Sequence, residues 1–119
     1  MNVKLKLASM LIAYRYAKKQ TQTKVSKKLN VSFQQVQKYE RMQNGLSSEK
    51  LFTFCEAYNI PVGDFQTKDP WTILDGADID IIQKEKALQK IDNLERIAND
   101  QSRSEKNMVG QSISPISHI

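Results

Sequence analysis

The sequence predicts an all-α protein, with a compact domain of five short helices, a C-terminal amphipathic helix and a disordered tail. Three observations predict this fold class. Apolar residues recur every three or four positions in the longer segments. Residues that cap helices stand where this periodicity begins or ends. Only four glycines and three prolines interrupt the 119 residues.

The first two helices are predicted over residues 3–19 and 21–29. The first carries apolar side chains at helical spacing. Thr21 is a good N-cap for the second, and Asn30 ends it, because asparagine tolerates the left-handed conformation nearly as well as glycine. Residues 30–32 can therefore make a tight turn into a third helix.

The third helix is predicted over residues 33–41, with amides and a base on its exposed side. Ser32 and Gln35 form an S-x-x-Q capping box, in which the hydroxyl and the amide reciprocally satisfy two backbone donors. Val36 and Tyr39 share the face that should meet the core. Two short helices joined by a three-residue turn are a helix-turn-helix motif.

Two more helices complete the predicted compact domain. Ser47 or Ser48 can cap the fourth, which continues to Tyr58. Pro61 suits the first position of a short fifth helix that ends near Phe65. A break is expected soon afterwards, at the Asp-Pro pair of residues 69 and 70.

This break divides the chain into a domain of residues 1–68, a linker with an amphipathic helix over 69–100, and a tail. The helix itself is predicted from residue 78 to residue 100. Its apolar stripe consists of Ala87, Ile91, Leu94 and Ala98. That spacing suits a short coiled-coil seam between two chains or a packing arm against the same chain. Residues 101–119 are polar and aperiodic, which predicts disorder.

The net charge of +5 is unevenly distributed. Residues 1–66 hold eleven Lys and Arg against four acidic residues, which gives +7, whereas residues 67–119 hold seven against nine, which gives −2. A localised positive field favours a polyanionic partner, because phosphates release counterions when cationic side chains neutralise them. Charge alone does not choose between DNA, RNA and a membrane surface.

Several function classes are disfavoured by composition. A single cysteine, Cys55, and a single histidine exclude an internal disulfide and a multi-cysteine zinc site. We find neither a P-loop nor a nucleophile elbow, so we expect no enzyme and no cofactor. No apolar run approaches the roughly 20 residues of a membrane span, and the first residues do not resemble a secretory signal, so we expect a cytoplasmic protein without membrane partners.

A set of residues in the first half of the chain occurs in a recognisable order and spacing. It consists of Arg15, Thr21-Gln22, Ser26, Leu29, Val31-Ser32, Val36, Tyr39-Glu40, Leu51, Phe54, Cys55, Tyr58, Ile60 and Phe65. In this set the chain resembles the helix-turn-helix of phage-repressor-like, Xre-type bacterial regulators, from about Leu11 to Phe65. The chain departs from that family at Lys19 and Met42, where glycine is frequent, so the turns after the first and third helices are expected to differ.

The resemblance also implies which side chains contact DNA. The base-contacting positions of the family fall on Phe33, Gln34, Gln37 and Lys38. Glutamine can pair with adenine, lysine with guanine, and an aromatic edge can touch the thymine methyl group. The expected phosphate contacts are Gln22, Lys27, Ser32, Gln35, Arg41, Asn44 and Lys50. Arg15 and Glu40 occupy positions that form a buried ion pair in phage repressors; the alternative is an exposed pair of little energetic effect.

These features predict a sequence-specific, double-stranded DNA-binding transcriptional regulator, and we expect a repressor. Helix 33–41 would enter the major groove, and a homodimer would read two half-sites about one helical turn apart. The stripe from residue 87 to residue 98 is the candidate dimer seam. The alternative function is a protein-interaction adaptor or antitoxin-type module with the same fold, which an exposed apolar face would favour.

Overall fold

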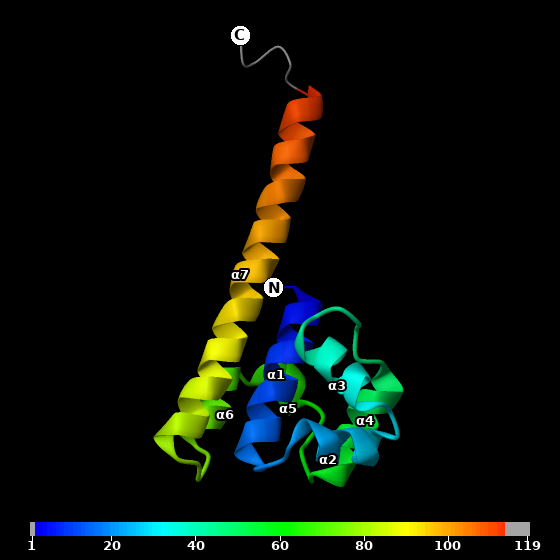
Figure 1. Ribbon diagram of the computed structural model, residues 1–119, viewed down its shortest axis with the longest axis vertical. Coiled ribbons are helices and arrows are strands. Elements are labelled where there is room, and N and C mark those ends of the chain that lie inside the picture. The colour runs from blue at the N-terminus through cyan, green and yellow to red at the C-terminus, as the bar shows by residue number, and fades with distance from the viewer. Residues whose placement is uncertain (1, 114–119) are drawn as a thin grey trace.

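The computed structural model describes the backbone of residues 2–113 and the side chains of residues 2–100. Within these residues it contains seven helices and no strand (Figure 1), so the predicted all-α class is confirmed. The helices are α1 (Val3–Ala17), α2 (Gln22–Leu29), α3 (Phe33–Glu40), α4 (Ser48–Ala57), α5 (Asp64–Thr67), α6 (Pro70–Asp75) and α7 (Ile81–Ile113).

Side-chain caps fix where most of the helices begin. A side-chain oxygen of the N-cap residue accepts a backbone N–H of the first turn in six of the seven helices, at Asn2, Thr21, Ser32, Ser47, Asp69 and Asp80. This satisfies one of the donors that a helix start leaves open. The predicted caps Thr21 and Ser32 are confirmed, and Ser47 rather than Ser48 caps α4.

Left-handed residues end the first four helices. Lys19, Asn30, Met42 and Asn59 follow α1 to α4 within two residues of each helix end, with φ between 54° and 60°. The predicted role of Asn30 is confirmed, because its backbone N–H bonds back onto the last turn of α2. At Lys19 and Met42, where the regulators that the sequence resembles frequently have glycine, ordinary side chains adopt a conformation that favours glycine.

The main core joins α1 to the helix-turn-helix and to α4 and α5. Phe54 is fully buried, with its ring centroid 4.9 Å from that of Tyr58 and 6.1 Å from that of Phe65. The buried members of this cluster are Met10, Leu11, Tyr14, Val25, Leu29, Val36, Tyr39, Phe54, Cys55, Ile60 and Phe65. Because α2 and α3 each contribute residues to it, the core fixes the angle at which α3 projects.

The segment after residue 68 differs from the prediction. Pro70 starts α6 instead of marking a break, because Asp69 Oδ1 accepts the backbone N–H of Thr72 at 2.8 Å and proline is tolerated in the first helical turn. The sequence pattern did not predict this helix. The preceding helix, α5, starts at Asp64 and not at Pro61.

A second core cluster lies on the other side of α1. It consists of Ala8, Ile12 and Ala13 from α1, Leu74 from α6, and Ala87, Ile91 and Leu94 from α7. Figure 1 shows α7 running beside α1 in the opposite direction and continuing past its N-terminus. Three of the four residues of the predicted dimer seam, Ala87, Ile91 and Leu94, are therefore packed against the chain's own α1 and α6.

The start and end of α7 also differ from the predicted range 78–100. The side chain of Asp80 accepts the backbone N–H of Gln83 at 2.9 Å, and the helix begins at Ile81. It extends to Ile113, so residues 101–113 of the predicted tail continue the helix. The first proline after this helix start is Pro115. Residues 114–119 of the tail lie outside the described residues.

Candidate nucleic-acid interface

The predicted base-contacting residues lie on the outer side of α3. Val36 and Tyr39 are buried on the inner side and hold the helix to the core. Gln34 and Lys38 are exposed, and Gln37 is half-buried. Phe33, the fourth residue of the set, is 40% exposed at the start of the helix. The core thus leaves a polar face of α3 open to a ligand.

The two ends of this polar face are tied together by Gln35 and Asn44. Ser32 Oγ accepts the backbone N–H of Gln35 at 3.0 Å, as the capping box requires. The amide of Gln35, however, does not complete the box. Its Oε1 accepts from Asn44 Nδ2 at 3.1 Å, which links the start of α3 to the loop after it. Two predicted phosphate contacts therefore support each other's position.

A buried ion pair joins α1 to the C-terminal end of α3. Arg15 Nε lies 2.5 Å from Glu40 Oε2, and Arg15 Nη2 donates to Glu40 Oε1 at 2.9 Å. Arg15 Nη1 also donates to the carbonyl oxygen of Gln20 at 3.0 Å. Burial would lower the pKa of Arg15, but the hydrogen bond and charge of Glu40 outweigh it and raise that pKa.

The carboxylate of Glu40 also reaches α2 and α7. Gln22 Nε2 donates to Glu40 Oε1 at 3.0 Å, and Lys90 Nζ lies 3.8 Å from the same oxygen. One buried carboxylate therefore connects four helices around the start of the helix-turn-helix. A primary amide has two N–H donors, so Gln22 can keep this bond and still offer a donor to a phosphate.

The remaining predicted phosphate contacts differ in availability. Lys27, Ser32 and Arg41 are exposed. Lys50 is half-buried, and its Nζ donates to the carbonyl oxygen of Leu29 at 2.9 Å. Its ammonium group therefore satisfies an open carbonyl at the end of α2. A phosphate would have to share Lys50 with this carbonyl.

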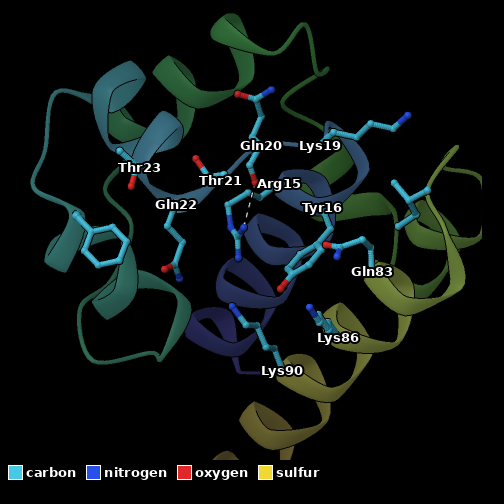
Figure 2. Close-up of a pocket in the computed structure, with 12 residues that line it drawn as sticks. Arg15, Tyr16, Lys19, Gln20, Thr21, Gln22, Thr23, Gln83, Lys86 and Lys90 are labelled. Carbon is cyan, nitrogen blue, oxygen red and sulfur yellow. Dashed lines mark hydrogen bonds between the residues drawn. The ribbon is translucent and has the colours of Figure 1, made fainter.

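Residues of α7 that sequence reasoning did not assign to the site border it. Figure 2 shows Lys86 and Lys90 of α7 facing the same hollow as Gln22 of α2 and Tyr16 of α1. The ammonium group of Lys90 lies 5.5 Å from the centroid of the Tyr16 ring. The signal that could have identified these residues is a stripe of amides and lysines along α7, beside its apolar stripe.

Other site chemistry finds little support in the described residues. The side chains described include no group of three or more His, Cys, Asp and Glu residues that could hold a metal ion. Burial raises the pKa of the Cys55 thiol, which favours the unreactive protonated form. None of the helices within residues 2–113 has both the length and the apolar content that a membrane span requires.

Comparison with known proteins identifies relatives of this region. Residues 11–65 match the family model described as "Helix-turn-helix". Over 53 residues the chain is 36% identical to the "Uncharacterized transcriptional regulator in ATPase CF(0) region" of Rhodospirillum rubrum, which covers 41% of this chain and 49% of that protein. The chain thus spans about half the length of this relative. No solved structure matches the chain.

Proposed function

We propose that this protein is a sequence-specific, double-stranded DNA-binding regulator of transcription, because residues 11–65 match the helix-turn-helix family model and the sequence resembles Xre-type regulators. It inserts α3 into the major groove, and it acts as a repressor like the phage repressors that its sequence resembles. The observation that carries the proposal is the exposed polar face of a helix whose other side is locked into the core.

The side chains on the outer side of α3 contact the DNA bases. Gln34 and Gln37 offer amides that can make two hydrogen bonds with adenine, and Lys38 offers donors to guanine O6 and N7. These contacts need a helix held in one orientation. The buried Val36 and Tyr39 supply packing, and the ion pair of Glu40 anchors the end of α3.

The two ends of the helix-turn-helix bind the phosphates of the DNA backbone. The first backbone N–H groups of α2 and the amide of Gln22 suit one phosphate, since a helix N-terminus favours an anion. Arg41 and Asn44 in the loop after α3 suit another, and Lys27 adds charge on the exposed side of α2. The +7 charge of residues 1–66 supports this assignment.

We propose that two copies bind together on two half-sites spaced about 10 base pairs apart. Their contact lies outside the apolar stripe of α7, because Ala87, Ile91 and Leu94 are 0%, 1% and 3% exposed in the chain's own core. Ala98 is partly exposed, but one alanine does not make a seam. Exposed Ile81 and Ile82 at the start of α7 offer the two copies another apolar surface.

The alternative, a protein-interaction adaptor or antitoxin-type module, fits α3 less well. Protein interfaces concentrate aromatic and apolar residues at their centre. The exposed face of α3 carries two amides and an ammonium group, with Phe33 at one end. The larger exposed apolar side chains Phe52 and Trp71 belong to α4 and α6 and lie outside this face.

Selection of random duplex oligonucleotides by the full chain tests the proposal. We expect enrichment of an inverted repeat and, at physiological salt, an affinity for it at least about 10³-fold higher than for a scrambled duplex. Affinity for both duplexes should fall steeply with salt. A selected pool without enrichment, together with equal affinity for all duplexes, would rule out sequence-specific DNA binding.

A further inference from the structure

We propose that α7 carries a second phosphate-contacting surface, which binds the DNA backbone beside the half-site that α3 reads. We call it the α7 stripe, and it consists of Gln83, Lys86, Lys90 and Asn93. This inference rests on the proposed DNA-binding function. It extends the interface to a helix outside residues 11–65, the region that matches the family model.

The first half of the α7 stripe faces the start of the helix-turn-helix. Gln83, Lys86 and Lys90 line a hollow together with Gln22 (Figure 2). Phe33 lines the same hollow. The hollow has a volume of about 480 Å³, and the residues described around it include several cationic side chains and no carboxylate. Small-molecule pockets of this size are mainly apolar, so this lining suits an anion with hydrogen-bond acceptors better than an apolar ligand.

The second half of the stripe faces α3 and the loop that follows it. Lys90 and Asn93 line a neighbouring hollow with Gln37 and Arg41, and Lys90 and Gln22 belong to both hollows. The stripe therefore follows the edge of the α2–α3 face from one hollow to the next. An extended ligand such as a nucleic-acid strand can follow such a surface, whereas a single small anion would occupy only part of it.

The stripe residues of α7 are basic or neutral, and the acidic residues between them lie on another face of the helix. A surface that binds DNA phosphates requires this separation, because carboxylates would repel them. Residues 83, 86, 90 and 93 follow the three- and four-residue spacing of one helix face. By the same spacing, Glu85 and Asp92 fall on the far side of α7. Among the described side chains, the one carboxylate that lines either hollow is Glu40, and it is buried and paired with Arg15.

The stripe is held in place by the second core cluster. Ala87 and Ile91 are fully buried against α1, so the residues between and beside them have defined positions relative to α2. Lys90 is further fixed by Glu40 and Tyr16. Lys86 is exposed, which leaves its charge available to a phosphate and makes it the cleaner residue to test.

The test compares Lys86→Gln with Arg96→Gln in the full chain. Both variants remove one exposed positive charge from α7, but Arg96 lies outside the stripe and pairs with Asp92 at 3.0 Å. We measure affinity for the selected duplex and for a scrambled duplex between 0.1 and 1 M salt. Loss of one phosphate contact should make the slope of log K against log salt less negative by about 0.9. Between 1 M and 0.1 M salt, the variant should therefore gain roughly eightfold less affinity than the wild type.

For Lys86→Gln we expect this change on both duplexes, because phosphate contacts carry no sequence information. For Arg96→Gln we expect wild-type slopes. Sequence-specific binding by the wild type together with an unchanged slope for Lys86→Gln would overturn the role of the stripe but leave the DNA-binding function intact. Tighter binding by Lys86→Gln would mean that α7 obstructs DNA, and it would also overturn the proposal. A wild type without sequence preference would overturn both proposals.

Discussion

Arg15 and Glu40 form a two-point ion pair in the interior of the protein. Their charged atoms meet at 2.5 and 2.9 Å, and their side chains are only 6% and 3% exposed. The pair joins α1, the central helix of both core clusters, to the end of the helix proposed to read DNA. Its strength therefore affects the stability of the protein and the orientation of α3 together.

Arg15→Ala should reduce the free energy of unfolding by about 3–5 kcal/mol, because it leaves a buried carboxylate without its main partner. Lys90, 3.8 Å from Glu40, can compensate in part, which favours the lower end of that range. Chemical denaturation of the variant measures the loss. The exposed Arg41→Ala is the control and should change stability by less than about 0.5 kcal/mol. A loss below about 1 kcal/mol for Arg15→Ala would contradict a structural role of the pair.

Gln34→Ala and Lys38→Ala should each relax sequence preference by about 1–3 kcal/mol, because each removes a side chain from the exposed face of α3. Lys27→Ala should instead weaken binding to all sequences alike. Titration of each variant against the selected duplex and single-base variants of it gives both quantities. Equal losses on selected and scrambled DNA for Gln34→Ala would argue against base reading.

Local features of the fold could be predicted from the sequence, and long-range ones could not. Thr21, Ser32 and Asn30 act within three residues of their own positions, so their types alone indicated where α2 begins and ends and where α3 begins. Asp69 and Pro70 are ambiguous, because the same pair ends one element and starts another. An apolar stripe shows that a helix face is buried, but not whether the partner is the same chain or a second copy. For this reason the sequence position of Ile91 was compatible both with a coiled-coil seam between two chains and with packing against the same chain.

In the candidate site, too, the local features could be predicted from the sequence and the long-range contacts could not. Exposure of Gln34 and Lys38 follows from the helical period, once Val36 and Tyr39 are assigned to the core. The bond from Lys50 to the Leu29 carbonyl crosses 21 residues, and no local pattern indicates it. The approach of α7 to α2 likewise depends on how α7 packs against α1. The packing brings Lys90 next to Glu40, 50 residues earlier in the chain.

Low pH should destabilise the folded protein, in part because Asp64 becomes protonated. Tyr14 Oη donates to Asp64 Oδ2 at 2.7 Å, and this bond, aided by Lys68 at 3.3 Å, lowers the pKa of Asp64. A carboxyl with a lower pKa in the folded state stabilises the protein above its unfolded pKa, near 4, and loses that stabilisation as the pH falls through the folded value. The free energy of unfolding should therefore decrease below about pH 4.

Removing either Asp64 or the Tyr14 hydroxyl should make the free energy of unfolding depend less steeply on pH below about pH 4. Asp64→Asn removes the titrating group, and Tyr14→Phe removes the bond that lowers its pKa while keeping the ring that stacks on Phe65 at 5.6 Å. The double variant should behave like Asp64→Asn. Denaturant titrations at several pH values from 2.5 to 7 measure the slopes. An acid limb of Tyr14→Phe as steep as that of the wild type would exclude this bond as the cause.

Lys19→Gly should stabilise the protein by roughly 0.5–1 kcal/mol, because Lys19 has a φ of 57° and glycine adopts this conformation at lower cost. Lys18→Gly is the matched control. Its φ is −88°, so glycine gains nothing there and should destabilise through greater freedom of the unfolded chain. Thermal unfolding without DNA measures both changes. The prediction is wrong if the two variants shift the melting temperature in the same direction.

Ile91→Ala should reduce the free energy of unfolding by about 2–5 kcal/mol, because the side chain is 1% exposed in the core between α1 and α7. The loss should be the same at every protein concentration, since the partner surface belongs to the same chain. A coiled-coil seam would behave differently, with a melting temperature that rises with concentration and a variant that dissociates. Ile82→Ala, at a position 61% exposed, should cost less than about 0.5 kcal/mol. If Ile91→Ala changed the oligomeric state and left the folding of the monomer unaffected, the second core cluster would not be the packing site of α7 in solution.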